Sequence, residues 1–196
     1  MIRIYNEIKK QTENGYIKND WFNDEIKNLL YKDTEKKIIK CIAKSLKPKA
    51  ANLEEKVKLI FKPFSLFPMS ETKLILMGQA PYPDSEQLKG LAFLFDTNNM
   101  KTDDLLGNIS IVSTLYNNDK VFNVWDKNVE KCAADNKILL LNSILTYENE
   151  QTLQLHKDAW DLFTKKILSV LINSKGSPST FLWVKNGNNI LFQKLM

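Results

Sequence analysis

Short apolar runs that end at small or polar residues constrain the fold of this chain more than any other feature. Three of these runs, with the residue to which each leads, are residues 73–77 with Gly78, residues 138–141 with Asn142, and residues 180–184 with Lys185. A further apolar run lies at residues 91–95. Continuous apolar runs of this length are typical of strands in a parallel sheet that is buried on both faces.

Segments with helical patterns lie before and between these runs. They span residues 36–46, 105–116, 128–134 and 156–173. Strands that alternate with helices predict the α/β class, and specifically a three-layer α/β/α sandwich with a central, mainly parallel four-stranded sheet. We expect a single domain over residues 1–196, with N-terminal helices at 1–60 and an α/β core at 61–196.

The carboxyl ends of the predicted strands are the expected place for a site. In open parallel sheets, ligands bind where the strands end. Gly78, Asn142 and Lys185 each follow a predicted strand, so we expect these three to mark one edge. Residues 61–68 are aromatic and interrupted by prolines, which predicts an irregular connection packed against the core.

Charge and composition permit some partners and exclude others. The 196-residue chain is 43% hydrophobic and has a net charge of +5. A basic chain suits DNA because binding releases counterions, although surface lysines also serve solubility. The single histidine excludes a multi-histidine metal site, and we predict no cofactor and no metal.

Membrane and disulfide signals are missing from the sequence. No segment is long and apolar enough to span a bilayer, and no signal peptide is recognisable. Cys41 and Cys132 lie far apart and lack metal-ligand spacing. We therefore expect a cytoplasmic protein with two reduced, buried thiols and no membrane partner.

Four segments match the motifs of one known family in order and in spacing. They are Met77-Gly-Gln-Ala-Pro-Tyr-Pro83 with Gly90-Leu-Ala-Phe93, Leu139-Leu-Leu-Asn-Ser-Ile-Leu-Thr146, Ala159-Trp-Asp-Leu-Phe-Thr164, and Phe181-Leu-Trp183. This set resembles the signatures of uracil-DNA glycosylases, which read GQDPYH followed by GL(A/C)F, LLLN-x-x-LT, GW-x-x-FT and FLLWG. The resemblance runs from about residue 60 to residue 190.

The resemblance implies a pocket that holds a base flipped out of the DNA stack. Phe93 would stack on the uracil ring. Asn142 would pair with the N3–H and O4 edge of uracil and disfavour cytosine, because an amide offers both an acceptor and donors. Tyr82 would block the methyl group of thymine, and Gln79 would offer its backbone N–H to a base carbonyl.

The sequence departs from the family at the positions that carry out the chemistry. Ala80 stands where the family has an aspartate that positions water and stabilises the sugar cation, and Pro83 stands where it has a histidine. The later HPSPL-type loop, with its histidine and its leucine, has no counterpart before the sequence ends at Met196. Asp84 and Glu86 are the candidate replacement carboxylates, with a solvated loop charge as the alternative for each.

Contacts to DNA are expected from basic residues near the predicted edge. The candidates are Lys89, Lys157, Lys185 and His156, the last as a surface or phosphate contact rather than a catalyst. The expected partners are uracil-containing DNA and a protein inhibitor that mimics DNA.

Two functions are consistent with these residues. The first is a divergent uracil-DNA glycosylase that recognises uracil by base flipping and has weak or altered N-glycosidic hydrolysis. The second is a catalytically inactive relative that binds DNA or a DNA-mimic inhibitor. An unrelated α/β hydrolase or nucleotide-binding protein lacks support, because the chain has no nucleophile elbow and no phosphate-binding glycine loop.

Overall fold

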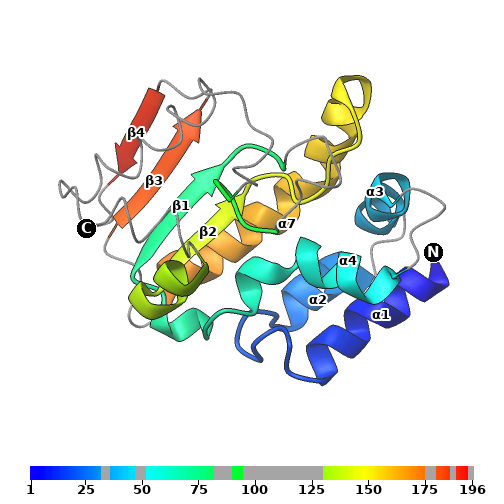
Figure 1. The fold of residues 1–196 in the computed structure, drawn as a ribbon, viewed down its shortest axis with the longest axis horizontal. Helices are drawn as coiled ribbons and strands as arrows, with labels where there is room; N and C mark the ends of the chain where they lie inside the picture. Colours follow the sequence, from blue (N-terminus) through cyan, green and yellow to red (C-terminus); the bar gives the residue numbers. More distant parts are fainter. Residues whose placement is uncertain are drawn as a thin grey trace.

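The sheet is built from strands in the order β2-β1-β3-β4. The computed structural model describes residues 1–31, 36–46, 52–81, 90–94 and 130–174, and the backbone of the strands at 180–185 and 189–193. β1 (Leu74–Gly78) pairs in parallel with β2 (Ile138–Asn142) and with β3 (Thr180–Lys185) (Figure 1). β4 (Asn189–Gln193) runs antiparallel to β3.

Three of the four apolar runs are confirmed as strands. The fourth, at 91–95, is not a strand over the described residues, because residues 91–94 form a turn. β4 lies at 189–193, a segment to which the sequence analysis assigned no element.

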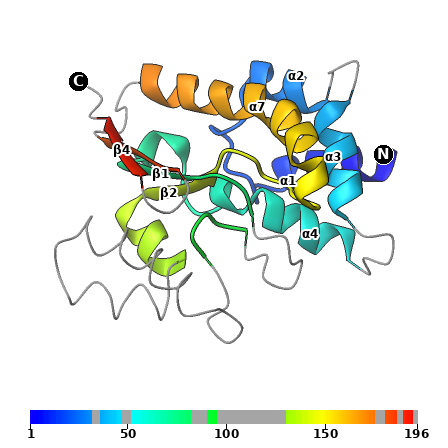
Figure 2. The same ribbon diagram turned by 90° about the horizontal axis from the view of Figure 1, so that it is seen from above.

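The sheet is covered on both faces. Successive side chains of a strand point to opposite faces, so β1 and β2 divide their residues between two cores. Ile75, Leu139 and Leu141 belong to the larger core, together with residues of α7 (Leu153–Asn173). On the other face of the sheet, strand residues form a smaller core with Cys132 and Ala133 from the helix at 130–136. These strand residues are Leu76, Ile138 and Leu140. Seen from above, α7 and this helix lie on opposite sides of the sheet (Figure 2), and the expected α/β fold is confirmed.

Four N-terminal helices pack against α7 and against one another. They are α1 (Ile2–Glu13), α2 (Asp24–Tyr31), α3 (Lys37–Ser45) and α4 (Leu53–Ile60). α7 contacts α2 and α3, while α1 contacts α3 and α4. The predicted helices at 36–46 and 156–173 are confirmed. Of the helix predicted at 128–134, the described residues 130–134 are helical, and the helix continues to residue 136. The helix predicted at 105–116 lies outside the described residues.

An aromatic cluster joins the N-terminal helices to the sheet. Phe61 and Phe64 belong to the irregular connection predicted at 61–68, and both are fully buried. Phe61 makes an edge-to-face contact with Trp160 of α7, and Phe64 makes one with Phe163. Such pairs contribute about 0.5–1.5 kcal/mol beyond the area they bury. The connection therefore packs against the core, as its composition predicted.

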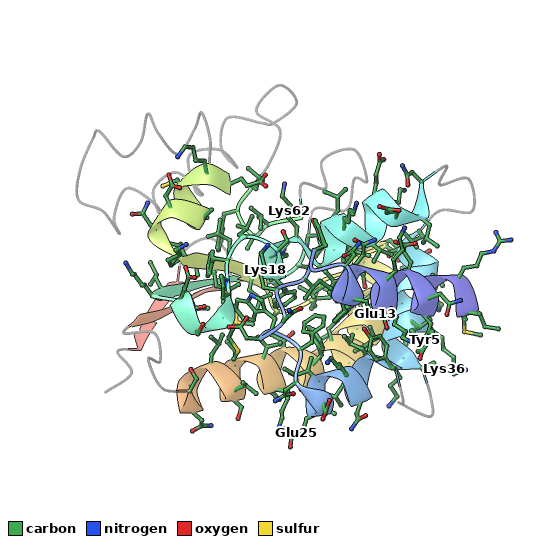
Figure 3. All side chains as sticks on the ribbon, turned by 90° about the horizontal axis from the view of Figure 1, so that it is seen from below. Tyr5, Glu13, Lys18, Glu25, Lys36 and Lys62 are labelled. Atoms are coloured by element: carbon green, nitrogen blue, oxygen red, sulfur yellow. The ribbon has the colours of Figure 1, made fainter. Side chains whose placement is uncertain are left out.

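Ion pairs tie the outer surfaces of neighbouring elements together. Glu25 of α2 pairs with Lys166 of α7, and Figure 3 shows Glu25 where these two helices run side by side. Lys62 pairs with Glu130 at 2.6 Å and so joins the connection after α4 to the helix at 130–136. Exposed pairs of this kind stabilise a fold by only about 0–1 kcal/mol, so the apolar cores dominate.

Two further expectations concern the cysteines and membranes. Cys41 and Cys132 are buried and carry no disulfide, as predicted. Among the helices of the described residues, none combines the length and apolar character that crossing a bilayer requires.

Candidate functional site

The carboxyl ends of β1 and β2 bring Gly78 and Asn142 together. The two residues are register partners in the parallel pair. A Cβ atom added to Gly78 would lie 2.4 Å from Asn142 Oδ1 and 3.3 Å from the Cβ of Ala92. The Asn142 amide therefore occupies space that is open only because residue 78 has no side chain. β3 runs parallel to β1, so Lys185 ends its strand at the same edge.

Backbone hydrogen bonds join the loops that follow these two strands. Ser143 N–H donates to the Gly78 carbonyl at 2.9 Å, and Ile144 N–H donates to the Gln79 carbonyl at 3.0 Å. Ser143 Oγ donates to the same Gln79 carbonyl at 2.7 Å. The Gln79 carbonyl thus accepts two hydrogen bonds, while its side chain is exposed. Sequence reasoning did not single out Ser143, although it stands inside the LLLN-x-x-LT-like segment.

The turn at residues 90–94 lies beside this edge. Ala92 N–H donates to the Leu140 carbonyl of β2 at 3.3 Å. Phe93 follows with a φ of +64°, is half-buried and packs against the smaller core. A left-handed backbone costs a non-glycine residue about 1–2 kcal/mol, and such positions cluster at functional sites. The strained residue is therefore the one that the sequence assigned to base stacking.

His156 is not at the surface, and the prediction that it contacts DNA is wrong. Its side chain is fully buried, and its Nδ1 lies 2.8 Å from Thr146 Oγ1. Trp160 Nε1 donates to the same hydroxyl at 2.7 Å. Helical spacing could have shown this, because residue 156 lies one turn before Trp160 on the face that α7 buries.

Burial gives His156 a pH-dependent effect on stability. Desolvation lowers its pKa from the ordinary value of 6.5, and Lys44 lowers the pKa further, whereas Glu148 opposes the shift. As the pH falls below about 6.5 the unfolded chain takes up a proton that the folded protein resists, so unfolding becomes easier by up to about 1.4 kcal/mol per pH unit. We expect the free energy of unfolding to fall between about pH 7 and pH 5.5.

Denaturant titrations over this pH range check the prediction. The chain has one histidine, so His156→Gln removes the only side chain that ordinarily titrates there. This variant is expected to be less stable at neutral pH, because the hydrogen bond between His156 Nδ1 and Thr146 Oγ1 is altered. Its free energy of unfolding should depend less steeply on pH than that of the wild type. Equal slopes for the two proteins would contradict the assignment.

The remaining predicted residues are only partly placed. Tyr82, Asp84, Glu86 and Lys89 lie outside the described residues. Lys157 is exposed on α7, and the backbone of Lys185 ends β3. No three histidine, cysteine, aspartate or glutamate side chains of the described residues come together as metal ligands would.

Several proteins are similar in sequence to this chain over most of its length. It is 33% identical over 162 residues to the uracil-DNA glycosylase of Mycoplasma genitalium. The matched segment covers 81% of this chain and 65% of that protein. It is 26% identical over 167 residues to the uracil-DNA glycosylase of Borreliella burgdorferi, with 85% and 73% covered. The chain is therefore similar to proteins named uracil-DNA glycosylase over most of its length.

The similarity extends to a third named relative and to a solved structure. The uracil-DNA glycosylase of Campylobacter jejuni is 28% identical over 186 residues, with 93% of this chain and 77% of that protein covered. No family model matches the sequence. The crystal structure of wild-type UNG from Nitratifractor salsuginis is similar with a TM-score of 0.49 and 16% identity, over 93% of this chain and 90% of that one. The chain spans about two-thirds of the length of the Mycoplasma relative, at 65%.

Ala80 stands at the position where the resemblance places an aspartate. Its side chain is half-buried and packs against the larger core. A methyl group carries no charge and no hydrogen-bonding atom, so it can neither orient water nor stabilise a cation. Ala80 lies two residues after Gly78, at the start of the segment that follows β1.

Proposed function

We propose that the chain recognises uracil in DNA by base flipping and catalyses weak or altered N-glycosidic hydrolysis, which would place it in base-excision DNA repair. One observation supports this above the others: the amide of Asn142 lies against Gly78 at the carboxyl edge of the sheet, beside the turn that carries Phe93. The proposal extends to a single-domain, three-layer sandwich of the superfamily type and to a cytoplasmic location.

The chemistry of an amide suits the uracil edge. Uracil presents a donor at N3 and an acceptor at O4, and Asn142 can satisfy both with its Oδ1 and Nδ2. Cytosine presents the opposite pattern at these atoms, so it would leave a buried group unpaired at a cost of about 1–3 kcal/mol. Phe93 would add base stacking of about 1–3 kcal/mol.

The proposed hydrolysis lacks its usual carboxylate. Loss of one electrostatic stabiliser commonly lowers a rate by about 10²–10³-fold, and groups that act together lose non-additively. Asp84 and Glu86 are the proposed substitutes, since they follow Gly78 by six and eight residues in the sequence. Lys89, Lys157 and Lys185 are the proposed phosphate contacts.

A second function is favoured by Ala80. If no carboxylate replaces the family aspartate, the protein would bind uracil-containing DNA, or a protein inhibitor that mimics DNA, without cleaving the glycosidic bond. The half-buried methyl of Ala80 supports this alternative, because a methyl group has no atom that could position water.

An abasic-site assay separates the two functions. Protein in excess is incubated with a uracil-containing oligonucleotide, and abasic sites are then cleaved with alkali. We expect product with the wild type and a fall of about 10-fold or more with Asn142→Ala, because the base edge loses its partner. Asp84→Ala should remove product if Asp84 acts as the carboxylate.

Asn173→Ala is the matched control for Asn142→Ala. Asn173 ends α7 and is exposed, and among the described residues its side-chain amide donates to Ser169, so its loss should leave product unchanged. No product from the wild type, together with measurable binding of the same oligonucleotide, would favour the non-catalytic function. Equal preference for uracil and thymine would contradict both.

A further inference from the structure

Three residues of α7, each one turn from the next, contact the segment that follows β2. His156, Trp160 and Thr164 are four residues apart, so they share one side of the helix. Thr164 Oγ1 donates to the Ser143 carbonyl at 2.9 Å. Trp160 Nε1 donates to Thr146 Oγ1 at 2.7 Å, and His156 Nδ1 lies 2.8 Å from that same hydroxyl. α7 therefore holds this segment at both of its ends.

The held segment in turn holds the loop after β1. The Ser143 N–H donates to the Gly78 carbonyl at 2.9 Å, and the Ser143 Oγ donates to the Gln79 carbonyl at 2.7 Å. Its own carbonyl is the acceptor for Thr164. A continuous path of hydrogen bonds thus runs from α7 through one residue to the loop at Gln79. The Thr164 side chain is almost completely buried, so water does not readily replace its hydroxyl.

We propose that Thr164 and Ser143 are positioning residues for the proposed uracil-binding site, which comprises Asn142, Gly78 and the turn that carries Phe93. This inference rests on the proposed function. Neither residue is assigned a contact with the base. Ser143 directly follows Asn142, so the orientation of the Ser143 peptide sets where the Asn142 amide lies. A misplacement of about 1 Å in a binding constellation can cost about 10²-fold in rate.

Three variants test the role of the Thr164 hydroxyl. Thr164→Val removes the hydroxyl and keeps the branched shape, while Thr164→Ser keeps the hydroxyl and should restore function. Thr12→Val is the matched control, because Thr12 is a half-buried threonine of α1 whose Oγ1 donates to the Ile8 carbonyl at 3.1 Å and lies 3.1 Å from the Tyr31 hydroxyl.

The first measurement is amide hydrogen exchange. The N–H groups of Ser143 and Ile144 donate across to the loop after β1, so their exchange reports whether the two loops stay joined. In Thr164→Val we expect exchange at these two amides to accelerate by about 3- to 10-fold, which corresponds to the loss of one ordinary hydrogen bond. Amides of β1 and α1 should not change.

The second measurement is the ratio of dissociation constants for two oligonucleotides that differ only by uracil or thymine. Thr164→Val should reduce this ratio by about 3- to 10-fold, whereas Thr164→Ser and Thr12→Val should keep it. Recovery in the serine variant separates positioning by the hydroxyl from a general loss of packing.

The two measurements distinguish the possible failures. Unchanged exchange at Ser143 and Ile144 in Thr164→Val, or equal acceleration throughout the sheet, would overturn the positioning role. A wild type without any preference for uracil would instead overturn the proposed function, and the exchange comparison would still decide whether Thr164 joins the loops.

Discussion

The Gly78→Ala variant is expected to lose most of its preference for uracil and to keep its fold. The added Cβ would lie 2.4 Å from Asn142 Oδ1, so the amide must rotate away. The backbone of Gly78 does not have a positive φ, and β1 therefore tolerates alanine. Losing the partner of a buried polar group costs about 1–3 kcal/mol, or roughly 5- to 150-fold in the dissociation constant.

A double-mutant cycle shows whether this loss passes through Asn142. Dissociation constants for the uracil and thymine oligonucleotides are measured for Gly78→Ala, Asn142→Ala and the double variant, with thermal unfolding of each as the check on folding. If alanine at 78 acts only by displacing the amide, the double variant is no worse than Asn142→Ala. Two independent, additive losses would show that Gly78 acts by another route.

The Gly90→Ala variant is expected to lose about 2–5 kcal/mol of stability. Gly90 has a φ of +80°, which costs a residue with a side chain about 1–2 kcal/mol. The new Cβ would also lie 2.3 Å from the backbone oxygen of Leu59 and 3.0 Å from the Cβ of Lys62. A backbone oxygen cannot rotate aside as an amide can, so overpacking adds about 1–3 kcal/mol.

Gly15→Ala is the matched control for this variant. Gly15 has nearly the same φ, +78°, but nothing lies within 4 Å of the Cβ that alanine would add. It should therefore show only the conformational cost of about 1–2 kcal/mol. Both free energies of unfolding are measured by denaturant titration. Equal losses in the two variants would mean that the turn at residue 90 does not pack on Leu59.

The parallel part of the sheet and the meeting of Gly78 with Asn142 could be predicted from the sequence. Apolar runs of five or so residues have few alternatives to buried strands, and parallel strands must end at a common edge. The position of Asn142 against Gly78 follows from that register. The pattern also predicted the irregular aromatic connection at 61–68, because prolines exclude a regular helix or strand there.

Other features depended on tertiary contacts that a local pattern does not contain. The run at 91–95 is as apolar as a strand, yet residues 91–94 turn because Gly90 and Phe93 have left-handed backbones. β4 includes polar residues at both ends and gave no continuous apolar signal. His156 was predicted to contact DNA because it begins a predicted helix near where the resemblance places a histidine-containing loop on the DNA side, whereas in the structure Thr146 supplies a partner for the buried ring.

Trp160 gives the N-terminal half of the chain a direct mechanical link to the edge of the sheet. Its indole makes edge-to-face contacts with Phe61 and Phe163, and its N–H donates to the hydroxyl of Thr146. A substitution that loosens the aromatic cluster, even one at Phe22, which contacts Phe61 and Phe163, would therefore release an anchor of the loop beside Asn142. Changes in base preference can then arise from residues that never meet DNA.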